Sequence, residues 1–184
     1  MVLFNIIVAH PKKIGGALIV RHSRFLLILM MILPWFSIPL LGQRTIKRFL
    51  PATILISCVV KINNITAKKR NWWQFYTSIH PKISGDIPFI LGPYFLASLW
   101  ILKLTYGKLI LFTITNAIGH ILFAFPGMKL LKRLGIVSLV QMKPIQLTLL
   151  LTIRGFLLYG FQFAIENIKQ KNSIFRFLKL IKKL

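Results

Sequence analysis

The chain has 184 residues, 56% of them hydrophobic, and its 25 lysines and arginines stand against only 2 acidic residues, for a formal charge of +23. Two carboxylates are too few for the enzymes that hold divalent ions with several acidic side chains. Cys58 is the only cysteine, which excludes an intrachain disulfide and a thiolate cluster. We therefore expect no metal and no cofactor.

The apolar residues form long runs without the polar gaps that a water-facing surface would require. Lipid is the solvent that such runs predict, so we expect an all-α polytopic membrane protein with four or five transmembrane helices. The cations gather in short clusters between the runs, where they would contact anionic lipids. The bilayer, anionic lipids and a protein partner are the expected partners. Nucleic acid is not, because a basic patch alone carries no base readout.

The first quarter of the chain contains one strong apolar run. Residues 1–24 read as a basic interfacial segment, and residues 25–41 as a span kinked by Pro34 and Pro39. The next run, residues 49–62, is shorter than the roughly 20 residues that a crossing needs. It is either re-entrant or a span whose flanking cations extend to the interface, which leaves four or five spans.

The remaining runs complete a single membrane domain over residues 25–165. Residues 87–104 and 109–125 form an antiparallel pair across a short turn, and Pro126–Gly127 are expected to end the second of them. We expect residues 134–140 to lie in the interface. Residues 145–165 form the last span, followed by a basic amphipathic tail at residues 166–184 on the membrane surface. Cations divide almost evenly between the two sides, and we take the N-terminus as inside.

The segment between the second and third runs carries aromatic and titratable residues. Trp72, Trp73 and Tyr76 are predicted to anchor the chain at the membrane interface. His80 and Asp86 resemble the His-x4-Asp motif of membrane-bound glycerolipid acyltransferases, although five residues separate them here. That resemblance implies a general base oriented by the aspartate. The favoured alternative is a surface turn with Asp86 at a helix N-terminus, where its charge suits the helix dipole.

Polar residues recur at helical spacing on three of the runs, and Tyr94, Ser98 and Thr105 align on residues 87–104. Asn116 and His120 share one face, and a longer polar face on the last run includes Gln162 and Glu166. Such faces either line a polar pathway or hold helices together by hydrogen bonds and close packing. Helix packing is the favoured interpretation. Glu166 is expected to be solvated or to pair with Lys169.

Arg154 lies off that polar face, near the middle of the last run. Glu166 is about 18 Å away along the helix axis, so no carboxylate is within simple reach of the guanidinium. An intramembrane cation without an acid suggests a functional role. The alternative, of equal weight, is that Arg154 extends to a lipid phosphate or bonds to a backbone carbonyl.

The expected function is that of a small, non-enzymatic accessory protein that binds a protein partner or an anionic lipid. One alternative is a small transporter or channel subunit for an anionic or amphipathic solute, and another is a lipid-modifying enzyme using His80 and Asp86. The expected location is a cell membrane with several crossings, the bacterial plasma membrane. These alternatives stay open at the level of sequence.

Membrane integration is directly testable. We expect the protein to sediment with membranes and to remain there after extraction with alkaline carbonate, because long apolar runs cannot be solvated by water. Immunoblotting of the pellet and the supernatant measures this. Release of the protein into the supernatant would contradict the prediction.

Overall fold

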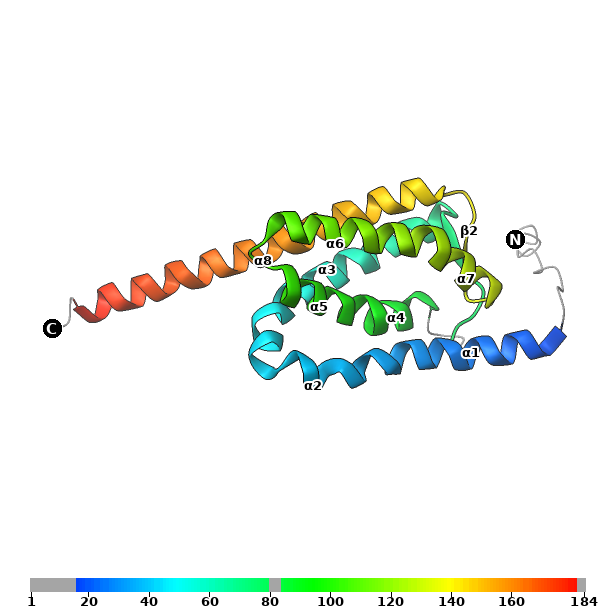
Figure 1. The fold of residues 1–184 in the computed structure, drawn as a ribbon, viewed down its shortest axis with the longest axis horizontal. Helices are drawn as coiled ribbons and strands as arrows, with labels where there is room; N and C mark the ends of the chain where they lie inside the picture. The colour runs from blue at the N-terminus through cyan, green and yellow to red at the C-terminus, as the bar shows by residue number, and fades with distance from the viewer. Residues whose placement is uncertain (1–15, 80–83, 182–184) are drawn as a thin grey trace, which may run out of the picture.

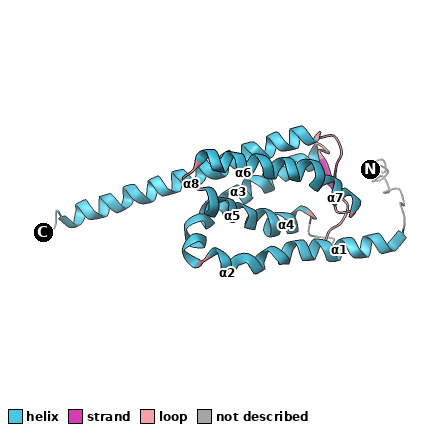
Figure 2. Ribbon diagram, viewed as in Figure 1, coloured by secondary structure: helices cyan, strands magenta, loops and turns pink. Residues whose placement is uncertain are grey.

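The computed structural model describes residues 16–79 and 84–181, and helices make up most of that part (Figures 1 and 2). In chain order the elements are α1 (Gly16–Ile32), the 3-10 turn η1 (Leu33–Ser37), α2 (Ile38–Leu41), α3 (Gln43–Lys69), β1 (Trp73–Phe75), α4 (Asp86–Phe89), the π-turn η2 (Ile90–Tyr94), α5 (Phe95–Thr105), α6 (Leu109–Leu122), the π-turn η3 (Phe123–Gly127), α7 (Met128–Arg133), β2 (Val137–Leu139) and α8 (Pro144–Ile181).

These elements join into helical segments that run alternately in opposite directions along one bundle (Figure 1). Within the described residues, five segments are long and apolar enough to cross a membrane: Ser23–Leu41, Gln43–Lys69, Asp86–Thr105, Leu109–Arg133 and Pro144–Lys171. The short run at residues 49–62 lies inside α3, which has 27 residues. Five segments of sufficient length are therefore present, rather than four.

Proline interrupts three of the segments without ending them. Pro34 opens the 3-10 turn η1, whereas Pro93 and Pro126 lie inside the π-turns η2 and η3. The expected end of the fourth segment at Pro126–Gly127 is wrong, because the chain stays helical to Arg133. A π-turn takes up one extra residue, which relieves the clash between the proline ring and the preceding turn.

A two-stranded antiparallel sheet connects two loops at one end of the bundle. Trp73 pairs with Leu139 and Phe75 with Val137, so the segment after α3 is joined to the segment after α7. The Tyr76 hydroxyl and the Ser138 hydroxyl lie 2.7 Å apart beside the sheet. The sequence gives no sign of these strands, because three residues are too few for an alternating pattern to stand out. Residues 134–140 thus include a strand of this sheet.

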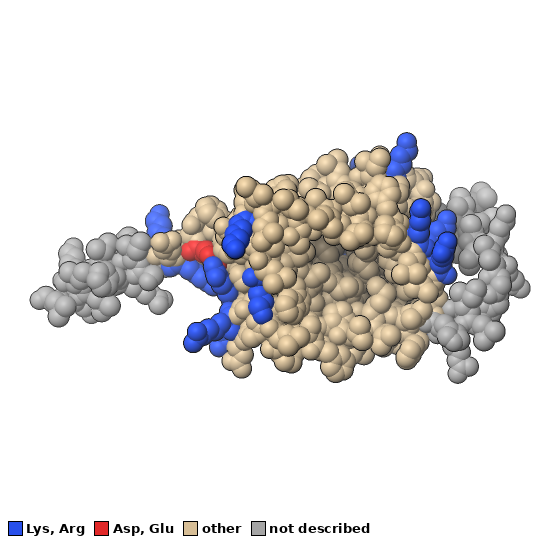
Figure 3. Space-filling model, in the orientation of Figure 1, with Lys and Arg blue, Asp and Glu red and all other residues tan. Residues whose placement is uncertain are grey.

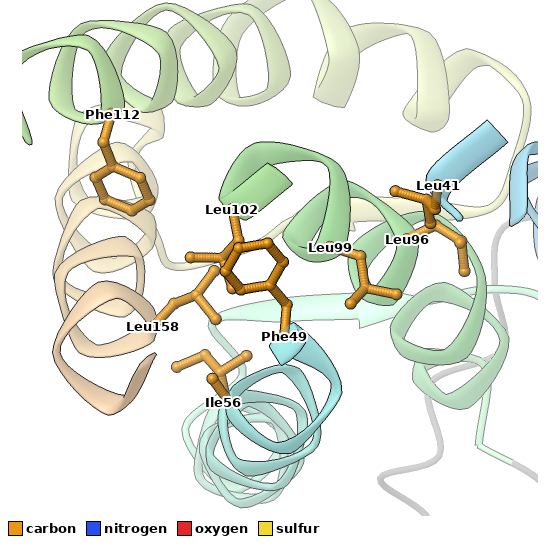
Figure 4. Packing of buried hydrophobic residues seen from close by; sticks show 9 residues of the cluster. Leu41, Phe49, Ile56, Leu96, Leu99, Leu102, Phe112 and Leu158 are labelled. Atoms are coloured by element: carbon orange, nitrogen blue, oxygen red, sulfur yellow. The ribbon is translucent and has the colours of Figure 1, made fainter. Parts of the chain in front are cut away.

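The hydrophobic core is centred on α3, which packs against α5 and α8. Side chains from five helices meet in the larger cluster (Figure 4): Leu41, Phe49, Ala52, Ile56, Leu96, Leu99, Leu102, Phe112 and Leu158. The outside is also apolar, with Phe36 77% and Ile110 78% exposed. On the face in Figure 3, lysine and arginine gather toward the two ends of the bundle. An apolar belt between two cationic ends is typical of a membrane protein.

The last helix is the longest element. α8 runs for 38 residues, about 57 Å, and its final part extends beyond the bundle (Figure 1). The backbone shows no break near residue 166, where the amphipathic tail was expected to begin. Attachment of residues 166–184 to a membrane surface stays a prediction.

Gly92 sets the distance between α1 and the π-turn η2, which provides a test of the fold. A Cβ atom there would lie 2.6 Å from the Met31 Cα and 2.7 Å from the Met30 carbonyl oxygen. We expect Gly92→Ala to lower the free energy of unfolding by roughly 1–3 kcal/mol, because backbone must move apart. Thermal unfolding in detergent measures this.

Gly119→Ala is the matched control, since no atom lies within 4 Å of a Cβ at that position. Equal unfolding temperatures for the two variants would show that α1 does not pack as the structure places it.

Candidate functional site

Both acidic side chains of the protein are paired with cations on α3. Lys61 Nζ lies 2.9 Å from Asp86 Oδ2, and Asn64 Nδ2 donates to the same oxygen at 3.2 Å. The Asp86 side chain is only 6% exposed, whereas that of Lys61 is 39% exposed. Asp86 begins α4, as the favoured alternative expected. This pair fixes the start of α4 against α3.

The second pair lies at the opposite end of α3. Arg48 donates from Nε to Glu166 Oε1 at 2.5 Å and from Nη2 to Glu166 Oε2 at 3.0 Å. Gln162 Nε2 donates to the same carboxylate at 2.8 Å. Glu166 therefore pairs with Arg48 rather than with Lys169, while its side chain stays 30% exposed. Sequence cannot show that the antiparallel packing of α3 and α8 places Arg48 beside Glu166.

Tyr106 adjoins this second pair from the turn between α5 and α6. The Arg48 guanidinium carbon lies 5.2 Å from the centre of the Tyr106 ring. Burial and the neighbouring Glu166 carboxylate raise the pKa of the Tyr106 phenol, which keeps it protonated. The cluster is thus a fixed junction between helix ends.

Arg154 is buried in α8, with 5% of its surface exposed. Its Nε and Nη2 atoms are buried and have no hydrogen-bond partner among the described residues. Since the two side-chain carboxylates of the chain are engaged by Lys61 and Arg48, neither neutralises this guanidinium. In the described part of the chain, Arg154 therefore lies apart from both side-chain carboxylates.

The guanidinium borders a space of about 60 Å³, here called the Arg154 cavity. One wall is the apolar face of the sheet, and Asn64 and Tyr94 supply polar groups among mostly apolar neighbours: Val60, Trp73, Phe75, Phe89, Phe123, Met128, Val137, Leu139 and Leu147. Leu147 lies two turns before Arg154, in keeping with the tilt of helical side chains toward the N-terminus. The cavity is large enough for one compact anionic group or a few waters.

A larger space, here called the groove, adjoins the Arg154 cavity. It measures about 430 Å³, lies between α1, α5, α6 and α8, and is lined mainly by apolar side chains. The surface is hollowed in this region, between α6 and α1 (Figure 3). Phe89, Tyr94 and Phe123 line both spaces, and the rings of Phe89 and Phe123 lie 5.6 Å apart. A charged cavity is therefore separated from an apolar groove by three aromatic side chains.

The predicted polar faces on α6 and α8 meet at this groove. His120 Nδ1 lies 3.4 Å from the Thr152 hydroxyl, and the buried Asn116 donates to the Phe112 carbonyl oxygen at 2.8 Å. A Cβ at Gly155 would lie 3.4 Å from Asn116 Oδ1, so the two helices approach closely there. Asn116 and His120 also line the groove. These residues therefore both pack α6 against α8, which is the favoured interpretation, and line the groove.

The other predicted residues fall into different places. His80 lies outside the described residues, so its relation to Asp86 is not placed. Trp73 lines the Arg154 cavity, Trp72 is half-buried, and Tyr76 is 50% exposed.

Sequence reasoning missed Lys61 and Asn64 as site residues. Lys61 was read as a snorkelling end of a short run, although Asn64 follows on the same helical face and strengthens the polar signal. Within residues 16–79 and 84–181, no three His, Cys, Asp or Glu side chains are grouped to hold a metal ion.

No protein-family model, curated protein or solved structure matches this chain. The function is therefore argued from its own geometry.

The two ion pairs differ in burial, which predicts different energetic weights. Lys61→Gln leaves the Asp86 carboxylate buried without its cation, and we expect a loss of about 1–3 kcal/mol in the free energy of unfolding. Arg48→Gln should cost less than about 1 kcal/mol, because that pair is more exposed. Chemical denaturation in mixed micelles measures both values.

The double variant Lys61→Gln with Asp86→Asn should recover much of the loss, since it removes the unpaired charge. If Lys61→Gln and Arg48→Gln lowered the free energy of unfolding equally, and the double variant regained none of it, the predicted difference between the two ion pairs would be wrong.

Proposed function

We propose that this chain is a small integral membrane protein that binds an anionic, apolar-tailed ligand through Arg154, acting as a binding or accessory protein rather than as an enzyme. The observation that carries the proposal is the buried guanidinium of Arg154, which has no carboxylate partner and borders a cavity beside an apolar groove. Anionic lipids of a cell membrane, the bacterial plasma membrane in the expected setting, are the ligand class that fits.

Burial of the Arg154 charge in a membrane has an energetic cost. A cation near the middle of a membrane helix costs roughly 2.5–3.5 kcal/mol on insertion scales. A guanidinium kept in such a position is stabilised by an acceptor, and carboxylate or phosphate groups match its planar donors bidentately. With both acids engaged elsewhere, a ligand is the source of the acceptor that the chain's own side chains do not supply.

The groove supports the apolar half of the proposal. Aliphatic and aromatic side chains dominate its lining, with Ser98, Asn116 and His120 as isolated polar points. Ligand sites commonly combine such an apolar lining with a few converging polar groups. A ligand with its head group at Arg154 and its acyl chain in the groove would extend past Phe89, Tyr94 and Phe123, which line both spaces.

A second candidate function, transport of the same class of solute, is favoured by the helix interruptions. Pro93 in η2 and Gly127 in η3 both line the groove, so two π-turns face the proposed tail site. Interrupted helices beside a mid-membrane site are common in transporters, and π-turns often occur at functional sites. Movement of ligand between leaflets in reconstituted vesicles would distinguish transport from binding.

The remaining alternative, a lipid-modifying enzyme, depends on His80 and Asp86. Asp86 Oδ2 already accepts hydrogen bonds from Lys61 and Asn64, which gives this aspartate a structural task without any histidine. We therefore do not base the proposal on this pair.

Arg154→Leu tests the proposal. In nanodiscs of phosphatidylcholine containing a minor fraction of phosphatidylglycerol, we expect the native protein to retain phosphatidylglycerol selectively. The variant should bind this probe about 10- to 100-fold more weakly, the loss expected for a hydrogen bond to a charged group. Native mass spectrometry of the released protein counts the bound lipid, and immunoblotting follows abundance, which we expect to be unchanged or higher.

Arg133→Leu, at an exposed arginine in α7, is the matched control and should retain the lipid. Equal retention by the two variants would refute a ligand role for Arg154. Loss of folded protein in Arg154→Leu, with Arg154→Lys restoring the fold but not lipid selectivity, would still support it. Restoration of both by lysine would show that only a positive charge is required and would contradict bidentate recognition.

A further inference from the structure

A third space lies at the surface end of the Arg154 cavity. This space, here called the vestibule, measures about 980 Å³ and is bounded by the end of α3, β1 and the start of α4. Its lining combines polar and apolar surface and includes Lys61, Asn64, Lys68, Gln74, Asp86 and Gln141. Such a lining contrasts with the apolar walls of the groove.

The vestibule and the Arg154 cavity share part of their walls. Asn64, Trp73 and Phe75 line both spaces. Asn64 is held by its hydrogen bond to Asp86, and it lies one helical turn from Lys61 on the vestibule side and from Val60 on the cavity side. The path from the surface to the guanidinium therefore passes a polar amide between two aromatic side chains.

We infer that the vestibule is the aqueous entrance through which an anionic group reaches Arg154, with Asn64 at the threshold and Lys61 as the outer cation. This inference rests on the proposed function, because it assigns the route and the surroundings of the same ligand's head group. The vestibule would thus be a second polar subsite for the head group, beside the site at Arg154.

Charge favours this route over the groove. Lys61 and Lys68 exceed the single carboxylate of Asp86 in the vestibule lining, so the potential there attracts anions, and low-dielectric walls focus it toward Arg154. A charged group that entered through the groove would instead lose its hydration among aliphatic side chains such as Leu130, Leu151 and Leu158. The charged end thus enters from the vestibule, whereas the apolar tail occupies the groove.

The sizes of the spaces narrow the class of ligand. The Arg154 cavity, at about 60 Å³, has room for a compact phosphate or carboxylate group. A polar substituent would extend into the vestibule, where amide side chains of Asn64, Gln74 and Gln141 offer donors and acceptors. The geometry therefore fits a phosphodiester lipid with a hydroxylated head group.

Cysteine accessibility tests the entrance without any lipid ligand. In nanodiscs, a Val60→Cys protein carrying Cys58→Ser is treated with anionic sulfonatoethyl methanethiosulfonate or with the cationic trimethylammonium analogue. Val60 lines the Arg154 cavity and not the vestibule. The groove also borders this cavity, but its lining is mainly apolar, so we expect a charged reagent to reach Val60 past Asn64. We expect the anionic reagent to react about tenfold faster, and Arg154→Leu to reduce this preference while Lys61 and Lys68 maintain part of it. Arg133→Leu should leave it unchanged.

The native Cys58 provides the control for lipid-facing thiols, because it is exposed on the outer surface of α3 and should react with neither charged reagent. If Val60→Cys does not fold, Leu147→Cys reports on the same cavity from α8. Absence of modification at a folded cavity cysteine, or an anion preference that Arg154→Leu leaves unchanged, would overturn the inferred entrance. Lipid retention is measured separately, so loss of phosphatidylglycerol selectivity with an intact anion preference would refute the proposed function alone.

Discussion

The scarcity of carboxylates is the constraint on which the structure depends. Asp86 and Glu166 are the only acidic residues against 25 lysines and arginines, and each is bonded to a cation of α3. The two cations, Arg48 and Lys61, are 13 residues apart, about 20 Å along the helix. α3 is thereby tied to α8 at one end and to α4 at the other. Arg154 is left without a side-chain acid.

The central position of α3 follows from the same arrangement. Between its two ion pairs, α3 buries Phe49 and Ile56 against side chains of α5 and α8. Ion pairs near the ends contribute little where they are exposed, so burial of these apolar side chains and close packing hold the middle of the bundle. The pairs instead fix which helix faces which. That choice determines the walls of the Arg154 cavity.

The π-turns and the sheet shape the space that the helices leave open. If the helices were straight, α5 and α6 would pack against each other as far as the sheet. The π-turns η2 and η3, which contain Pro93 and Pro126, instead change the direction of these two segments. Their aromatic neighbours Phe89 and Phe123 then meet between the cavity and the groove. The sheet closes the same end with the apolar face of Trp73, Phe75, Val137 and Leu139. Three spaces in series result from these interruptions.

By itself, the sequence determined the helical class, the apolar segments, the kink at Pro34, the polar faces of α6 and α8, and the absence of an acid near Arg154. These features are set by composition and by periodicity within one helix, which a sequence carries directly. Only the tertiary structure decided the Arg48–Glu166 and Lys61–Asp86 pairs, the β1–β2 sheet and the continuation past Pro126. Each of these depends on contacts between residues far apart in the chain or on a local π-turn, and helical periodicity encodes neither.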